Sequence, residues 1–127
     1  MPKPTVVILG ASADRAKFGN KSLRAHLEEG YEVFPVNPKG GTIEGLTVYK
    51  RLAEVPIDRF DRISSYLPPA VGIALLDEIA AAAPSEFFLN PGSESPELLD
   101  KARAIGLTPI LACSIVDLGR RPEEFGA

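Results

Sequence analysis

Cysteine and histidine are almost absent from this sequence, which holds one of each among its 127 residues. The single cysteine, Cys113, cannot form a disulfide within the chain, and so low a content suits a reducing compartment. No His, Cys and Asp residues are spaced as in a metal site. His26 falls inside an expected helix, where we expect a surface or partly buried residue rather than a catalyst. No Ser-His-Asp set can be assembled without it.

Charge and hydrophobicity are not concentrated anywhere along the chain. The 14 basic and 17 acidic residues give a net charge of −3, and no Lys/Arg face is clustered, which argues against nucleic acid as a partner. No apolar stretch approaches the roughly 18 residues that would span a bilayer. Residues 1–4 lack the layout of a signal peptide. We therefore expect a cytoplasmic protein without a membrane partner.

Short apolar runs alternate with helical patterns along the chain. Residues 5–9 are β-branched and uninterrupted, as in a strand buried on both faces. Leu23 and Leu27 lie four apart in a helix expected over residues 20–29, with Asn20 as its N-cap. We expect further strands over residues 31–36, 62–67, 86–89 and 107–112, a short edge strand over 47–49, and helical segments over 52–55, 71–82 and 96–104. The polar residues after Gly119 are expected to fray.

This alternation predicts an α/β fold in a single domain spanning residues 1–127. The expected architecture is a Rossmann-type, doubly wound parallel sheet of about five strands, with helices on both faces. In such sheets a ligand binds outside the carboxyl ends of the strands, where the strand order reverses. The turns that follow the strands are therefore the candidate site, and they comprise residues 10–12, 37–41, 67–69, 90–92 and 113–114.

The first of these turns predicts a phosphate site. Gly10 allows a tight bend, and the small side chains of Ala11 and Ser12 let the backbone approach a ligand. The helix that follows offers unpaired N–H groups to an anion. Arg15 and Lys17 add positive charge that could reach a phosphate. The alternative is an ordinary glycine turn with Arg15 and Lys17 in solvent.

The second turn indicates which nucleotide the site could bind. A dinucleotide fingerprint needs three glycines and an acidic residue about twenty positions later, but Ser12 and Arg15 replace the second and third glycines. The second strand ends at Asn37 without an acidic residue, which disfavours NAD. Lys39 instead suits a ribose phosphate, either the 3′-phosphate of coenzyme A (CoA) or the 2′-phosphate of NADP. The competing interpretation is that Lys39 is an ordinary lysine in a turn and faces solvent.

Several stretches together resemble a known family, the CoA-binding domains related to the N-terminal domain of the succinyl-CoA synthetase α-subunit. The resemblance is closest to the small stand-alone bacterial and archaeal members and covers nearly the whole chain. It is carried by VVILGAS, KFGNKSLRAHLEEGYEVFPVNPK, GGTIEGLTVYKRLAEVP, DRISSYLPP and FFLNPG. The sequence departs from the family pattern at two positions. Asn90 stands where stand-alone members often have glutamine, and Ala112, before Cys113, stands where many members have arginine.

The resemblance implies a CoA or acyl-CoA ligand and a role for each turn. The pyrophosphate side would be held by Gly10, Ala11, Ser12, Arg15 and Lys17. The ribose 3′-phosphate and adenine would be flanked by Asn37, Pro38 and Lys39. The adenine–pantetheine side would be lined by Tyr66, Leu67 and Pro68, and the pantetheine arm by Asn90, Pro91 and Gly92.

The same resemblance implies binding without catalysis. The synthetase carries its phosphorylated histidine in a second domain, and no counterpart is present in these 127 residues. Two other hypotheses stay open, an NADP-binding oxidoreductase-type domain and a ligand-gated interaction subunit. A homodimer or another protein partner is also left open. For Cys113 we favour a small apolar residue ending a buried strand over a thiol that forms a mixed disulfide with CoA.

Overall fold

The computed structural model describes residues 3–127, and a five-stranded parallel sheet runs through it. The main sheet comprises β1 (Thr5–Leu9), β2 (Glu32–Val36), β5 (Arg62–Ser65), β6 (Glu86–Leu89) and β7 (Pro109–Leu111). Their order across the sheet is β2-β1-β5-β6-β7, and every neighbouring pair is parallel. The chain therefore winds in one direction from β1 to β2 and then crosses back to β5. This confirms the predicted doubly wound sheet and puts the reversal of strand order between β1 and β5.

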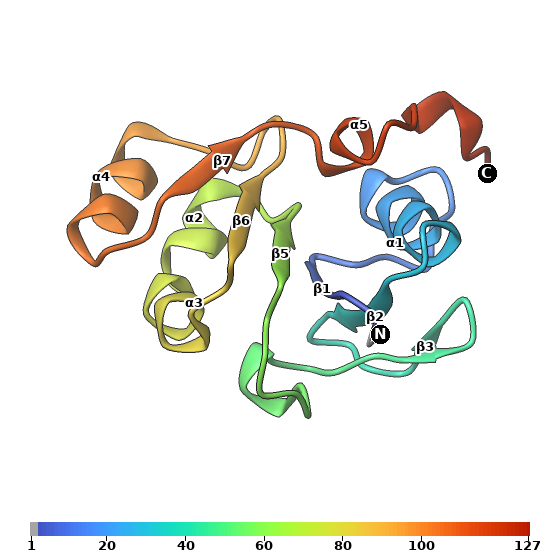
Figure 1. The fold of residues 1–127 in the computed structure, drawn as a ribbon, viewed down its shortest axis with the longest axis horizontal. Coiled ribbons are helices and arrows are strands. Elements are labelled where there is room, and N and C mark those ends of the chain that lie inside the picture. The colour runs from blue at the N-terminus through green and yellow to red at the C-terminus, as the bar shows by residue number, and fades with distance from the viewer. Residues whose placement is uncertain (1–2) are drawn as a thin grey trace.

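Helices cover both faces of the sheet, as predicted. Helices α1 (Phe18–Glu28) and α5 (Ser114–Asp117) lie on one face, and α2 (Pro69–Ile73), α3 (Leu76–Ala82) and α4 (Pro96–Ala104) lie on the other (Figure 1). The β1 side chains alternate between the two layers. Val7 and Leu9 pack with Leu76 and Leu98, while Val6 and Ile8 pack with Leu23 of α1. Within the part of the chain that the structure describes, no helix has the length and apolarity needed to cross a membrane.

The segment next to β2 at the edge of the sheet does not form the single strand predicted over residues 47–49. Strand β3 (Thr42–Ile43) and strand β4 (Leu46–Thr47) form a small antiparallel hairpin instead. Only Tyr49 joins the main sheet, donating its N–H to the Pro35 carbonyl at 3.0 Å and accepting the Asn37 N–H at 2.9 Å. A 3₁₀ turn, η1 (Leu52–Glu54), follows and corresponds to the short helical segment expected over residues 52–55.

The first helix begins earlier than predicted. Lys17 is its N-cap residue, not Asn20, and Asn20 is fully buried inside the first turn. The Asn20 side-chain amide donates to the Ser12 carbonyl at 2.8 Å. The residue typical of an N-cap therefore braces the glycine turn after β1, and the helix starts one turn sooner.

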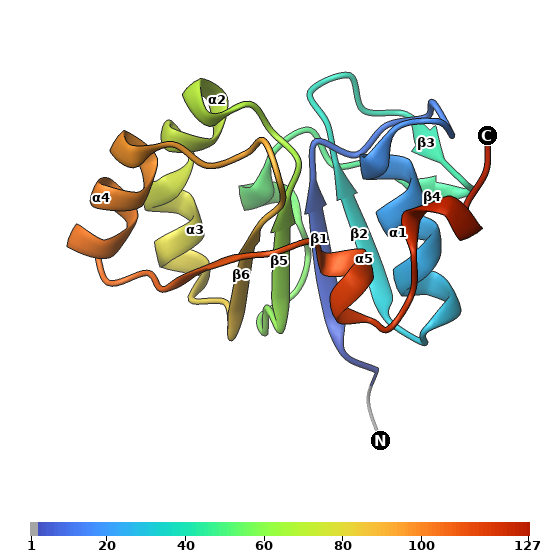
Figure 2. The same ribbon diagram turned by 90° about the horizontal axis from the view of Figure 1, so that it is seen from above.

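The predicted helix over residues 71–82 is two helices, α2 and α3, with a break at Ala74 and Leu75. Pro69 occupies the first turn of α2, and Ala83 ends α3 in the left-handed conformation at φ 50°. The break lets α2 pack against α4 while α3 packs against η1. Figure 2 shows α2 near the upper end of the sheet, above α3.

The residues after Gly119 do not fray. They form a second 3₁₀ turn, η2 (Pro122–Glu124), and Phe125 is only 3% exposed in a cluster with Ala25 and Ile115. Arg120 pairs with Glu28 and Glu29 of α1 at 2.9 and 3.0 Å. This C-terminal segment lies along α1 in both ribbon views (Figure 2). The expectation of a loose tail was wrong because the polar stretch contains one aromatic anchor and one paired arginine.

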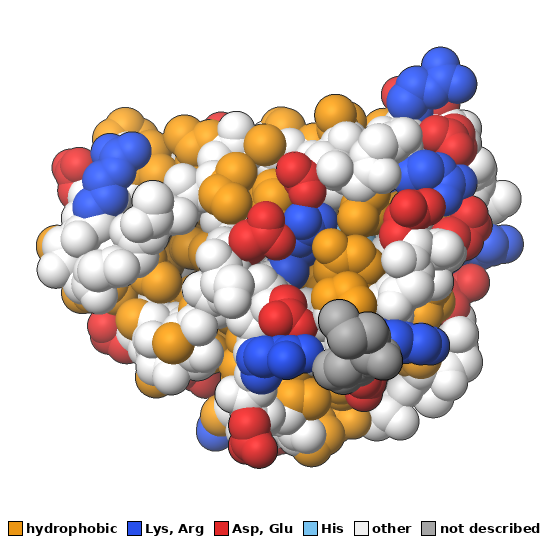
Figure 3. All heavy atoms as spheres, in the orientation of Figure 1, with side chains coloured by type: hydrophobic (Ala, Val, Ile, Leu, Met, Phe, Trp, Pro, Cys, Tyr) orange, Lys and Arg blue, Asp and Glu red, His pale blue; other side chains and the backbone are white. Residues whose placement is uncertain are grey.

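At the surface of the molecule where the parallel strands begin, several charged side chains form ion pairs. Arg59 and Asp61 lie 3.2 Å apart, and Arg62 contacts Glu86 at 3.0 Å and Asp117 at 2.6 Å. Figure 3 shows acidic and basic side chains beside one another across this face. Neighbouring opposite charges largely cancel at a distance, so this face presents no extended field of one sign.

Candidate functional site

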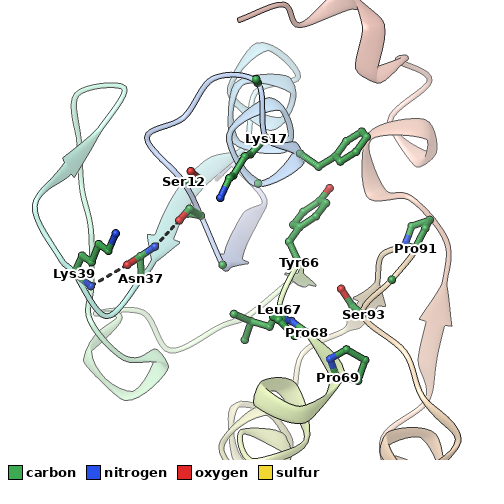
Figure 4. Close-up of a pocket in the computed structure, with 16 residues that line it drawn as sticks. Ser12, Lys17, Asn37, Lys39, Tyr66, Leu67, Pro68, Pro69, Pro91 and Ser93 are labelled. Atoms are coloured by element: carbon green, nitrogen blue, oxygen red, sulfur yellow. Dashed lines mark hydrogen bonds between the residues drawn. The ribbon is translucent and has the colours of Figure 1, made fainter.

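A cleft of about 780 Å³ lies across the carboxyl ends of the strands. Its walls are the turns after β1, β2, β5 and β6 together with the first turn of α1 (Figure 4). It spans the point between β1 and β5 where the strand order reverses, the position at which doubly wound sheets bind ligands. Its volume is within the range of about 300–1,000 Å³ common for small-molecule sites.

A close backbone contact shapes the floor of the cleft. Gly19, in the first turn of α1, lies so near the Gly10 carbonyl oxygen that a Cβ on Gly19 would be 2.5 Å from it. Gly10 itself has a φ of +82°, a conformation that other residues rarely adopt. Two glycines thus bring the start of α1 against the turn that follows β1.

The hydrogen bonds within the protein show which backbone N–H groups of the cleft residues have no partner. Gly10 and Ala11 both donate to the Val36 carbonyl, at 3.2 and 3.3 Å. Their amides are therefore already paired within the protein. Ser12, Phe18 and Gly19 also line the cleft, and their N–H groups have no acceptor among residues 3–127. Unpaired amides at the start of a helix are suited to an anion.

Two lysines supply the positive charge of the cleft. Lys17 and Lys39 are exposed, and neither forms an ion pair within the described chain. Their side chains extend into the space between the turns (Figure 4). Arg15, by contrast, pairs with Glu44 at 3.4 Å and does not line the cleft. Lys17 and Lys39 are thus the cations available to a ligand phosphate.

Asn37 and Asn90 hold the turns in position. The Asn37 amide donates to the Ala11 carbonyl at 2.8 Å, and its side-chain oxygen accepts the Lys39 N–H at 2.8 Å. Asn90 is 1% exposed and does not line the cleft. It donates to the Ser64 hydroxyl at 2.8 Å and accepts the Ser114 N–H at 2.8 Å.

Tyr66 connects the cleft to a buried group of hydroxyls. Its own hydroxyl lies 3.2 Å from the Ser114 hydroxyl, which is 2.8 Å from that of Ser64. Burial raises the pKa of Tyr66, so the phenol stays protonated at neutral pH. No three His, Cys, Asp or Glu side chains of residues 3–127 come together in a way that could hold a metal ion.

The comparison with protein families decides what this chain is. Residues 4–119 match the family described as "CoA binding domain". The chain belongs to this family. A conserved hypothetical protein from Pyrococcus furiosus is 35% identical to this CoA-binding domain, with a TM-score of 0.77 over 92% of this chain and 99% of that chain. A Thermus thermophilus protein is 27% identical, with a TM-score of 0.81 over 91% and 87% of the two chains.

One relative is part of a much longer protein. The α-subunit of ADP-forming acetate–CoA ligase I from Pyrococcus furiosus is 36% identical over 80 residues, which cover 58% of this chain. The match covers 17% of the ligase subunit, so the CoA-binding domain corresponds to a small part of that protein.

The cleft gathers most of the residues predicted from the CoA-binding resemblance. All except Arg15, Pro38 and Asn90 line it. Pro38 is exposed beside Lys39 but outside the lining, and Cys113 is partly buried among Ala25, Ile115 and Phe125, also outside it. The binding role of each lining residue stays a prediction.

The sequence reasoning assigned no binding role to five lining residues, Ala16, Phe18, Gly19, Pro69 and Ser93, although Pro69 lies within the turn predicted over residues 67–69. Gly19 had a signal, because a glycine in the first turn of a helix after a glycine turn is typical of a close helix–turn contact. Phe18 is 56% exposed at the rim, and an aromatic residue at a helix start carries no such signal. Ser93 directly follows the turn predicted over residues 90–92, so that turn was assigned one residue too short.

Proposed function

We propose that this domain binds coenzyme A or an acyl-CoA through the nucleotide end and catalyses no reaction by itself. The observation that carries the proposal is the pair of lysines, Lys17 and Lys39, which have no ion-pair partner within residues 3–127 and line a cleft together with three residues whose amides are unpaired. Family membership supports the choice of CoA among phosphate-bearing ligands. The relative that is a subunit of an acetate–CoA ligase supports it as well.

The residues present fit the phosphates of CoA. The amides of Ser12, Phe18 and Gly19 would donate to the pyrophosphate, with Lys17 neutralising its charge. Lys39 would face the ribose 3′-phosphate, since it follows β2, where nucleotide-binding sheets meet the ribose. When bound, CoA supplies a thiol that can carry an acyl group as a thioester.

The remaining lining suits binding better than catalysis. It contains no His, Cys, Asp or Glu side chain among the described residues. The phenol of Tyr66 has a raised pKa and does not ionise near neutral pH. Within residues 3–127 the lining therefore offers no carboxylate, imidazole or thiol that could exchange protons with a substrate.

A thermal-shift series tests this proposal against NADP. CoA, acetyl-CoA, NADPH, NADH and ADP are compared at one concentration with the intact protein. A ligand at about 100 times its Kd adds roughly 2.7 kcal/mol to the free energy of unfolding, or about 8 °C in Tm for a domain of this size. We expect CoA and acetyl-CoA to give the largest shifts. A larger shift with NADPH would contradict the proposal.

A further inference from the structure

The cleft is charged at one end and uncharged at the other. Lys17 and Lys39 lie toward the turns after β1 and β2, whereas the turns after β5 and β6 contribute no ionisable group other than Tyr66. Leu67, Pro68, Pro69 and Pro91 make this second end largely apolar, and Figure 4 shows the prolines across the cleft from Lys39. A ligand with phosphates at one end and an apolar group at the other matches this division.

A second hollow, of about 390 Å³, adjoins the apolar end. Pro69 lines both spaces, so the hollow and the cleft are neighbours on either side of this residue. It lies between the first turns of α2 and α4, two helices that pack against each other. Its lining is Pro69, Ala70, Ile73, Ser95, Pro96 and Glu97. This lining contains no basic side chain.

The hollow is large enough for a short hydrocarbon chain. A water molecule occupies about 30 Å³ of liquid, so the volume corresponds to about a dozen groups of that size. Ser95 already accepts the Leu98 N–H at 3.1 Å as the cap of α4. The side chains left to contact a ligand are therefore mostly the hydrocarbon surfaces of Pro69, Ala70, Ile73 and Pro96.

Glu97 makes the hollow unfavourable for a negatively charged acyl group. It is exposed in the first turn of α4 and lines the hollow. A second carboxylate entering the hollow would be repelled by Glu97. The cation beside the hollow is Lys101, which donates to the Ile73 carbonyl at 3.5 Å and lies 3.8 Å from Asp77, so its charge is already partly balanced. An uncharged chain would avoid the repulsion from Glu97 and contact mainly the apolar side chains of the lining.

We propose that this hollow is an acyl subsite that selects short, neutral acyl groups and disfavours dicarboxylic ones. The proposal rests on the binding of CoA in the adjoining cleft. The nucleotide end of an acyl-CoA would occupy the lysine end, and its acyl group would pass Pro69 into the hollow. Butyryl-CoA is then a better ligand than CoA, and succinyl-CoA a poorer one than butyryl-CoA.

Calorimetric titration of the wild-type protein with CoA, acetyl-CoA, butyryl-CoA and succinyl-CoA tests this subsite. We expect butyryl-CoA to bind about tenfold more tightly than CoA, because its methylene and methyl groups leave water. Succinyl-CoA should bind several-fold more weakly than butyryl-CoA. If all four bind equally, the acyl subsite is wrong and the CoA site stands. If none binds, both proposals fail.

Substitutions at Ala70, at the matched position Ala74 and at Glu97 test whether the acyl group binds in this hollow. Ala70→Phe fills the hollow and should remove the difference between butyryl-CoA and CoA. Ala74 is also exposed, lies four residues further along, and does not line the hollow, so Ala74→Phe should retain the difference. Glu97→Gln should improve succinyl-CoA binding a few-fold and leave butyryl-CoA unchanged. The proposal fails if Ala74→Phe and Ala70→Phe behave alike.

Discussion

At the scale of single residues, Gly19 connects the fold to the site. A Cβ at this position would lie 2.5 Å from the Gly10 carbonyl oxygen, a separation that the backbone must relieve by moving. The first turn of α1 would then shift away from the turn after β1. The unpaired amides of Phe18 and Gly19 belong to that first turn, so the same shift would move them relative to Lys39.

Gly19→Ala is therefore predicted to impair both stability and binding. We expect the free energy of unfolding to fall by about 1–3 kcal/mol, as for overpacked positions, and CoA affinity to fall about tenfold or more. Denaturant titration and calorimetry measure the two effects. Gly126→Ala is the control, because no atom lies within 4 Å of a Cβ there. Wild-type affinity in Gly19→Ala would show that the close contact does not shape the site.

The residue scale also shows how far sequence alone could locate the candidate site. Lys17 and Lys39 were predicted from their places after strand ends, and the structure brings both to the cleft. The assignments of Arg15 and Asn90 depended on partners far away in sequence, Glu44 and Ser114. Such long-range pairing carries no local pattern, so these residues could not be separated from true lining residues in advance.

At the scale of secondary-structure elements, one buried network joins α1, β5 and α5. His26 of α1 is fully buried, contrary to the expected surface or partly buried position. Its Nδ1 lies 2.8 Å from the Ser22 carbonyl and its Nε2 lies 3.3 Å from Arg62, which also pairs with Asp117. A carbonyl accepts and a guanidinium donates, so Nδ1 carries the hydrogen and the imidazole is neutral.

This network predicts a pH dependence of stability. Burial, together with the nearby Arg62 charge, lowers the pKa of His26 from 6.5 to about 4. Between these values the unfolded chain binds a proton that the folded protein does not. The free energy of unfolding should therefore fall as the pH drops from about 6.5 to 4, by up to about 3 kcal/mol from this group.

The His26 contribution can be isolated with His26→Gln. Denaturant titrations of both proteins from pH 7 to 4 give the difference in pH slope, which removes the contributions of the carboxylates. We expect the wild-type protein to lose more stability than His26→Gln over this window. Equal slopes would mean that His26 titrates normally in the folded protein.

The elements themselves were largely predictable, with failures at identifiable places. The five sheet strands lie within their predicted ranges because β-branched and aromatic runs bounded by glycine and proline specify short buried strands. The break between α2 and α3 was not visible, since the alanine-rich stretch is helical in its local preference. The C-terminal segment was missed because Phe125 is anchored by Ala25 and Ile115, contacts that only the folded chain creates.

At the scale of the whole molecule, charge is distributed unequally between two ends. Acidic and basic groups are paired over the face that carries the strand starts (Figure 3). At the opposite end, Lys17 and Lys39 have no such partners within residues 3–127. A protein with a formal net charge of −3 thus carries unpaired positive charge at the cleft, which would favour the proposed anionic ligand.

The most direct measurement is calorimetric titration of the wild-type protein and Lys39→Ala with CoA and with dephospho-CoA, which lacks the 3′-phosphate. If Lys39 faces that phosphate, the wild-type protein binds CoA about tenfold more tightly than dephospho-CoA, a difference of about 1.4 kcal/mol. Lys39→Ala should then bind both ligands with the weaker affinity. Equal wild-type affinities for the two ligands, or no binding of CoA, would contradict recognition of CoA through its nucleotide end.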